Sequence, residues 1–132
     1  TLPLSDAICT ALQLTNFWQD ISVDTGRNRF YIPREDLQKF GVRLDDLHSG
    51  TNSDAFRALM RMQIERTRQL FLNGKPLFLL VAKEFRMELK LIWHGGMRIL
   101  EKIEALNFDT RTVRPALTAV DSIIILYRAV RG

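Results

Sequence analysis

Four side chains that carry oxygen atoms recur at helical spacing near the start of the chain. Gln13, Asn16, Asp20 and Asp24 are separated by three, four and four residues. Since each residue of an α-helix turns by roughly 100°, this spacing places all four along one stripe of a single helix. The neighbours of these four residues are apolar, namely Leu12, Leu14, Phe17, Trp18, Ile21 and Val23. A polar stripe on such a helix is less typical of a solvated face than of a pocket, which could hold a cation or an anion bound through a cation.

The stripe and the residues after it have the chemistry of a magnesium and diphosphate site. Mg²⁺ prefers hard oxygen ligands, usually one or two carboxylates with water and substrate phosphate oxygens. The two carboxylates of the stripe can each offer such an oxygen, and the two amides can complete or orient the shell. Arg27 and Arg29 follow directly and supply fixed positive charge that can hold a diphosphate. Metal and arginines together would neutralise a leaving diphosphate and promote cleavage of its C–O bond.

An alternative is that these residues share no function. Asp20 and Asp24 can be solvated surface residues, while Arg27 and Arg29 stabilise the C-terminus of the helix through its dipole. A pair of aspartates one turn apart is common in helices, so the spacing alone leaves both interpretations open.

Hydrophobic periodicity predicts that the rest of the chain is helical as well. Apolar residues recur at intervals of three to four, and no alternating strand pattern extends beyond residues 30–32. The pair Gly95-Gly96 indicates a close approach by another helix or a ligand. The expected fold class is therefore all-α, with helices from a cap at Ser5 or Asp6 to residue 24 or 25, then at 33–40, 52 or 53 to 72, 76–106 and 118–130.

Composition limits the class of protein. The 132 residues suit one domain with a core, and the net charge of +4 comes from 19 basic and 15 acidic residues that are well mixed, so no nucleic-acid partner is predicted. Cys9 is the only cysteine, which excludes an internal disulfide and fits a reduced, cytoplasmic setting. The apolar stretches at residues 76–82 and 123–127 are far shorter than the roughly 20 residues that span a bilayer.

The sequence around the stripe resembles a known family motif. Residues 11–42, ALQLTNFWQDISVDTGRNRFYIPREDLQKFGV, are similar to the second aspartate-rich motif of the squalene and phytoene synthase family. The similarity extends more loosely through residues 88–109, ELKLIWHGGMRILEKIEALNFD, and the step Arg114-Pro115. It implies an isoprenoid-synthase-type helical bundle around a deep apolar cavity, with residues 1–132 as the C-terminal part of such a domain.

The resemblance also implies roles for the residues of the stripe. Asp20 and Asp24 match the aspartates that bind Mg²⁺ and the substrate diphosphate and that are needed for catalysis. Asn16 would be a further metal ligand, and both Asn16 and Gln13 would support the bound substrate. The cofactor implied is Mg²⁺, and the substrate implied is a prenyl diphosphate.

Several basic and aromatic positions are carried over in the same way, with departures. Arg29 and Tyr31 match the Arg and Tyr that bind substrate in the motif, although Asn28 stands where glycine is usual. The arginine pair often found before the late proline is here Val113-Arg114, so only Arg114 is carried over as a substrate-binding residue.

The branch within the family is indicated by the run NFWQD at residues 16–20. This run is most similar to the bacterial hopanoid-pathway branch, in which presqualene diphosphate is converted to hydroxysqualene or squalene with loss of diphosphate. Gln19 stands where phytoene-type and many squalene-type enzymes carry arginine. A neutral amide there weakens diphosphate binding, and we connect it with altered chemistry such as capture of water.

The first aspartate-rich motif of the family is absent from the chain. The adjacent pair Asp45-Asp46 follows the second motif and fits turn chemistry instead. The family's reaction clamps the diphosphate between two acidic helices, so we expect the chain alone to be inactive or nearly so. The alternative function is a non-catalytic helical interaction module derived from such an enzyme.

Half of a bundle is expected to leave apolar helix faces uncovered. Self-association, or a partner that carries the missing N-terminal half, would cover them. Residues 123–127 together with Arg128 and Arg131 also allow peripheral contact with an anionic membrane, although simple packing explains the same pattern.

Overall fold

The computed structural model describes residues 2–21, 32–43, 54–110 and 114–132, and its described part is helical without a strand. The fold class is all-α, as the periodicity predicted. Its elements, in chain order, are helix α1 (Leu2–Gln19), helix α3 (Arg34–Phe40), helix α5 (Asp54–Gly74), the short 3₁₀ helix η1 (Lys75–Leu79), helix α6 (Lys83–Ala105) and helix α7 (Ala119–Arg131).

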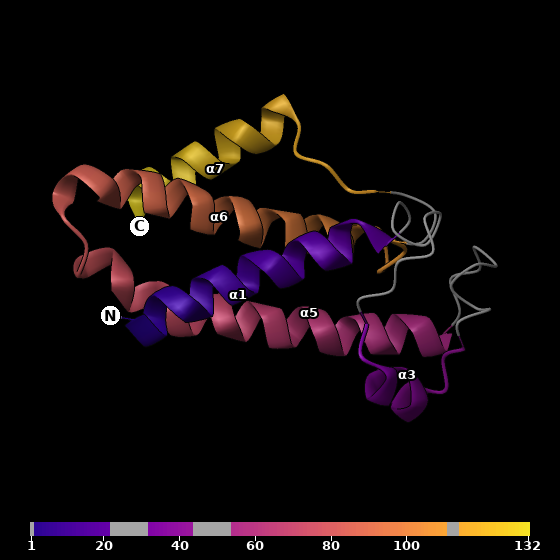
Figure 1. Cartoon of the computed structure of the whole chain (residues 1–132). Helices are drawn as coiled ribbons and strands as arrows, with labels where there is room; N and C mark the ends of the chain where they lie inside the picture. Colours follow the sequence, from indigo (N-terminus) through magenta and orange to yellow (C-terminus); the bar gives the residue numbers. More distant parts are fainter. Residues whose placement is uncertain (1, 22–31, 44–53, 111–113) are drawn as a thin grey trace.

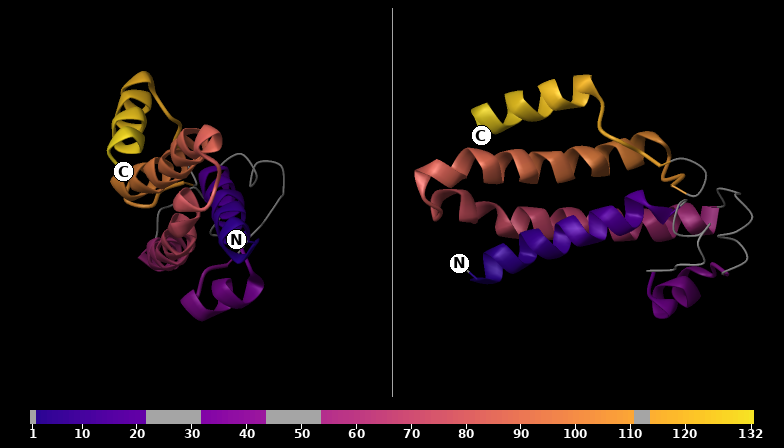
Figure 2. Two further views of the ribbon diagram at one scale, coloured as in Figure 1. Left: turned by 90° about the vertical axis from the view of Figure 1, so that its left-hand side faces the viewer. Right: turned by 45° about the horizontal axis from the view of Figure 1, so that its top comes forward.

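Three long helices lie side by side and form the core (Figures 1 and 2). Helices α1 and α5 pack along one another, and α6 runs back beside both of them. Helix α3 packs on α5 alone, and α7 packs on α6 alone, among the described elements. The packed face of α5 follows the helical period, since its buried residues include Phe56, Leu59, Met60, Ile64 and Phe71.

Two buried tryptophans join the long helices through their indole N–H groups. Trp18 of α1 donates a hydrogen bond to Oγ1 of Thr67 on α5 at 2.9 Å. Trp93 of α6 donates to the backbone oxygen of Phe71 on α5 at 2.7 Å. A buried tryptophan needs such a partner for its polar atom. Both rings therefore fix the rotation of their helices as well as filling the core.

The short helix α3 begins and ends as its sequence predicts. Pro33 precedes it, acidic residues occupy its first turn, and Gly41 ends it with a left-handed φ of 68°. Gln63 of α5 donates a hydrogen bond to Asp36 of α3 at 2.6 Å. This bond and the burial of Leu37 hold α3 against the N-terminal half of α5.

Two predicted helix boundaries are wrong. Helix α1 already begins at Leu2, so neither Ser5 nor Asp6 is its N-cap. The helix expected over residues 76–106 is divided into η1 and α6, because Pro76 sits in the first turn of η1 and the backbone at Ala82 is extended, with a ψ of 146°. The apolar run at residues 76–82 is therefore the turn between α5 and α6.

The two adjacent glycines of α6 have different surroundings. A Cβ atom at Gly96 would lie 2.4 Å from the Cζ atom of Phe71 and 3.2 Å from Cδ2 of Leu12, whereas a Cβ atom at Gly95 would meet nothing within 4 Å. The close helix approach expected at this pair is thus confirmed at Gly96. Gly95 has no packing reason to be glycine.

This difference predicts opposite effects of two neighbouring substitutions. Gly95→Ala should raise the free energy of unfolding by about 1 kcal/mol, since alanine is the better helix former. Gly96→Ala should lower it by about 1–3 kcal/mol, because the buried Phe71 ring has no room to move aside. Urea unfolding of both variants measures this, and equal shifts of the same sign would contradict the packing.

Several apolar residues at helical spacing in α6 and in the turn before it are exposed. Phe85 is 62% exposed and Ile92 is 45% exposed, and Leu80 in the preceding turn is 57% exposed. These residues follow the helical period, but the side of α6 on which they lie has no described neighbour. On α7 the exposed apolar residues are Val120, Ile123, Leu126, Tyr127 and Val130. An uncovered apolar surface is therefore present, as predicted from the sequence.

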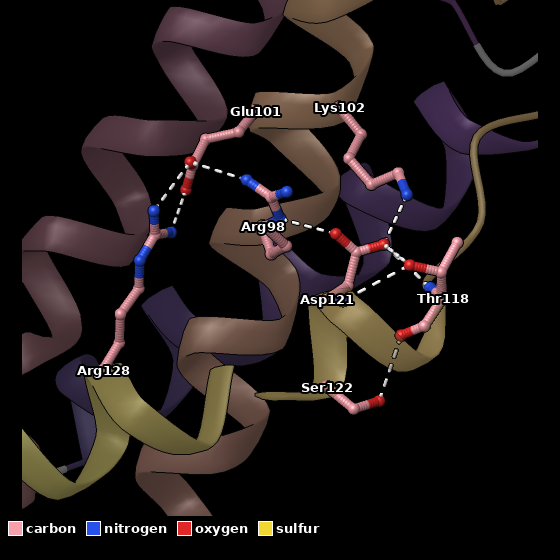
Figure 3. Close-up of polar contacts among 7 residues, drawn as sticks. All are labelled: Arg98, Glu101, Lys102, Thr118, Asp121, Ser122 and Arg128. Atoms are coloured by element: carbon pink, nitrogen blue, oxygen red, sulfur yellow. Dashed lines mark hydrogen bonds and ion pairs between the residues drawn. The ribbon is translucent and has the colours of Figure 1, made fainter. Parts of the chain in front are cut away.

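Helix α7 is attached to α6 by a cluster of charges (Figure 3). Asp121 is 2% exposed and accepts hydrogen bonds from Nε of Arg98 at 2.8 Å and from Lys102. It also forms a capping box with Thr118, whose backbone N–H donates to Asp121 at 2.8 Å. Two turns further along α7, Arg128 donates to Glu101 at 3.1 Å. The buried apolar contribution of α7 is small by comparison, namely Ile125 and Ala129.

The hydrogen bonds from Lys102, and then from the Thr118 backbone and Arg98, hold the pKa of Asp121 well below its usual range. A carboxyl whose pKa is lowered by folding stabilises the protein above its unfolded pKa of about 3.9 and loses that stabilisation as the pH falls below it.

We therefore expect Asp121→Asn to lower the melting temperature near neutral pH. The difference from the wild type should stay constant above about pH 5 and shrink below about pH 4. The other carboxyls titrate in both proteins, so the difference between the two melting curves isolates Asp121. A difference that stays constant down to pH 2 would contradict the assignment.

No helix in the described part of the chain combines the length and the hydropathy needed to cross a membrane.

Candidate functional site

The polar stripe of α1 lies on the side of the helix that faces away from α5. The opposite side carries the buried residues Ile8, Ala11, Thr15 and Trp18, whereas Gln13 and Asn16 are exposed. Asp20 follows the last residue of α1 and is half-buried. Its backbone N–H donates to the oxygen of Asn16 at 3.0 Å, so the helical turn continues and Asp20 stacks one turn above Asn16. Three of the four predicted stripe residues therefore share one accessible face.

Asp20 is joined to a predicted site residue from the far end of the chain. Nε of Arg114, which lies 94 residues later, donates to Oδ1 of Asp20 at 2.6 Å. Both side chains are partly exposed, so the pair contributes at most about 1 kcal/mol to stability. Its consequence is positional, because it places a guanidinium directly at the end of the stripe.

The residue before Asp20 is turned the other way. Gln19 is 6% exposed, and its Nε2 donates to the backbone oxygen of Pro115 at 2.7 Å. This bond anchors the segment that carries Arg114 to the end of α1. From the sequence, the neutral amide of Gln19 was expected to weaken diphosphate binding, whereas the contact that the structure describes for this amide is with the backbone oxygen of Pro115.

A pocket of about 370 Å³ opens beside this segment, and its lining includes Arg98, Lys102, Leu106, Arg114 and Pro115. Neither Arg98 nor Lys102 was predicted from the sequence as a site residue. Their one sequence signal is that they lie four residues apart on α6. Both are paired with Asp121, and Arg114 is paired with Asp20. The basic character of the pocket is thus partly neutralised by two carboxylates.

The remaining predicted site residues, Asp24, Arg27, Arg29 and Tyr31, lie outside the described residues. Their roles stay predictions. No group of three His, Cys, Asp or Glu side chains gathers in residues 2–21, 32–43, 54–110 and 114–132. What the described part offers is the Asp20 carboxylate with the amide oxygens of Asn16 and Gln13 on the same face. These are hard oxygen donors of the kind that Mg²⁺ takes.

Known proteins that are similar to this chain include two phytoene synthases and one squalene synthase. The 15-cis-phytoene synthase of Synechocystis sp. is 35% identical over 113 residues, which is 82% of this chain and 33% of that protein. Phytoene synthase 1 of Arabidopsis thaliana, a chloroplastic protein, is 31% identical over 122 residues, which is 91% of this chain and 28% of that protein. The crystal structure of squalene synthase HpnC from Alicyclobacillus acidocaldarius matches with a TM-score of 0.77 and 40% identity, over 80% of this chain and 40% of that chain.

The fold and the solved relative define an isoprenoid-synthase-type helical protein. The squalene/phytoene synthase family matches residues 1–121, and the chain belongs to that family. It spans about a third of the length of the curated relatives it matches.

Proposed function

We propose that the chain supplies one half of a Mg²⁺-dependent site for a prenyl diphosphate in isoprenoid biosynthesis. The observation that supports this most is the contact between Asp20 and Arg114 at the end of an accessible polar stripe. An acidic metal ligand and a basic diphosphate ligand, distant in sequence, are adjacent there. Membership of the squalene/phytoene synthase family supports the same chemistry.

In this proposal, the charge of each side chain determines which part of the ligand it binds. Asp20 and Asp24 bind the cation, and Asn16 and Gln13 supply neutral oxygens that orient it. Arg114, together with Arg27, Arg29 and Tyr31 from outside the described residues, binds the diphosphate oxygens. Bound Mg²⁺ supplies the positive charge that makes diphosphate a better leaving group.

The ion pair between Asp20 and Arg114 balances the charges of both side chains in the absence of substrate. If a magnesium diphosphate were bound, the Asp20 carboxylate would hold the cation in place of the guanidinium, and Arg114 would hold a phosphate oxygen in place of the carboxylate. Each side chain is partly exposed, so both can turn toward the ligand at little cost.

The substrate we propose is presqualene diphosphate, converted in a hopanoid-type pathway to hydroxysqualene, or to squalene where a hydride donor reduces the carbocation. The likeness to a squalene synthase at 40% identity, beside 35% and 31% for phytoene synthases, supports this branch. For the hydroxylated product, the C–O bond to diphosphate breaks with its electron pair on the leaving oxygen. Water then adds to the carbocation and releases a proton.

A second acidic helix is needed to complete such a site, and a region beyond the chain or a second protein would carry it. The exposed apolar residues of α6 and α7, such as Phe85, Ile92 and Ile123, support an association that covers them. The same exposed residues favour the other candidate function, a helical interaction module without catalysis. Ligand binding separates the two functions.

We expect Mg²⁺ with farnesyl thiodiphosphate, an unreactive substrate analogue, to raise the melting temperature of the chain. A ligand at several times its Kd adds about 1 kcal/mol, which corresponds to roughly 3–5 °C. Asp20→Asn with Asp24→Asn should abolish the rise. The control pair Asp6→Asn with Glu84→Gln removes the same charge from exposed positions elsewhere and should keep it. No rise in any of the proteins would favour the interaction module.

A turnover assay tests the half-site separately. The purified chain with Mg²⁺ and presqualene or farnesyl diphosphate should release no diphosphate above the protein-free rate. One aspartate-bearing helix cannot enclose the leaving group from both sides, so water continues to solvate the charge. Robust turnover by the chain alone would refute the need for a second half.

A further inference from the structure

A second cluster of basic side chains lies at the other end of the bundle from Asp20. It comprises Lys75 of η1, Lys90 and His94 of α6, and Arg128 and Arg131 of α7. Figure 1 shows that the C-terminal end of α7 lies near the turn between α5 and α6, while α1 ends at the opposite side of the molecule. We call these five residues the basic cluster. It shares no residue with the proposed diphosphate site.

Most of the charge in the basic cluster is not neutralised. Nζ of Lys75 lies 5.3 Å from the centre of the Trp93 ring, and Nζ of Lys90 lies 6.0 Å from that of Phe78. Arg131 similarly packs on Tyr127 and donates to its hydroxyl at 2.9 Å. Only Arg128 has a carboxylate partner within the described chain, namely Glu101. Aromatic faces thus hold three cations in place while leaving N–H donors free.

His94 lies in the middle of the basic cluster without a hydrogen-bond partner for its Nε2 atom, which is buried. Burial, followed by the charges of Lys75, Arg128 and Lys90, lowers the pKa of His94, while Glu101 acts in the opposite direction. An anion bound there would accept a hydrogen bond from the imidazole and offset the positive charge. The cations around His94 make a negatively charged group a favourable ligand at this place.

Two adjoining pockets are lined in part by residues of the basic cluster. One, of about 310 Å³, is lined by Lys75, His94, Arg128 and Arg131 with Tyr127. The other, of about 480 Å³, contains Lys75, Lys90 and Gly132 together with the apolar side chains of Leu72, Pro76, Phe78 and Leu79. Leu79 is 78% exposed, so the apolar pocket is open to the surface. A cationic pocket beside an open apolar pocket complements an amphiphile with an anionic head.

We propose that these two pockets bind an anionic phospholipid. The phosphate lies among Lys75, His94 and Arg131, and the start of an acyl chain lies against Phe78 and Leu79. The site would attach this end of the bundle to a membrane surface through one lipid head group, without a helix crossing the bilayer. It rests on residues apart from the diphosphate site, so failure of either proposal leaves the other standing.

Flotation with vesicles tests the proposal directly. The chain should float with phosphatidylcholine vesicles that contain phosphatidylglycerol and not with phosphatidylcholine alone. Lys75→Gln with Arg131→Gln should weaken binding roughly 10- to 30-fold, since each basic residue near an anionic surface contributes about one factor of five. Arg34→Gln with Lys39→Gln removes the same charge from exposed positions on α3 and should have a small effect.

Leu79→Ser distinguishes a lipid from a free anion. It should weaken vesicle binding, because the acyl contact is lost, but leave binding of inorganic phosphate unchanged. The altered side chains are exposed, so melting temperatures close to that of the wild type are expected for all these variants and confirm their folding.

Proton NMR reports on the site itself, because the chain has only two histidines. Dihexanoyl phosphatidylglycerol should raise the pKa of His94 more than inorganic phosphate at the same concentration, with His48 as internal reference. An equal effect of both ligands with no effect of Leu79→Ser would mean a free-anion site and overturn the lipid proposal. Equal loss of flotation in the two charge-removal pairs would mean non-specific attraction and overturn it as well.

Discussion

The packing of α1 against α5 determines what the rest of the molecule can do. Ala11 and Trp18 bury one side of α1, and the indole N–H of Trp18 is tied to Thr67. A helix whose rotation is fixed in this way must present its opposite side outward. Gln13 and Asn16 occupy that side because they are spaced out of phase with the buried residues. The orientation of the candidate site is thus a consequence of core packing, with the polar residues following.

The end of α1 illustrates how the core also brings distant residues to the site. Gln19 is buried and holds the backbone of Pro115, and its neighbour Asp20 is accessible and holds Arg114. Two adjacent residues therefore fix the same late segment, one through a neutral hydrogen bond and the other through charge. The buried bond is the stronger constraint, since water cannot replace it. Gln19 acts as a positioning residue for Arg114.

The sequence predicted the helices well where a local signal exists. Gly41 after α3 and Thr118 before α7 are at the ends that their residue types indicate. Residues 80–82 were misassigned because their apolar character fits a helix equally well, and only the tertiary turn between α5 and α6 decides otherwise. Exposure of Phe85 and Ile92 was also beyond a periodicity argument, since a period tells which residues share a face but not whether a neighbour covers it.

The functional sites also differ in how far they could be predicted from the sequence. The stripe of α1 was predictable because its members lie on one helix, and the family motif added Arg114 from a distant position. Asp121, by contrast, looked like an ordinary first-turn acid, and its pairing with Arg98 and Lys102 depends on how α7 crosses α6. Of the basic cluster, only Arg128 and Arg131 were connected with an anionic surface from the sequence, because Lys75 and His94 join them from two other elements.

Helix α7 combines a charged contact on one side with apolar side chains on the other, which is the reverse of the usual arrangement for a surface helix. Ion pairs such as those of Asp121 specify one docking position but contribute little hydrophobic stabilisation. A helix attached in this way remains in place mainly if its outer apolar side is also covered. The exposed side chains of Ile123 and Val130 therefore leave the outer side of α7 as an apolar surface that packing against another surface would stabilise.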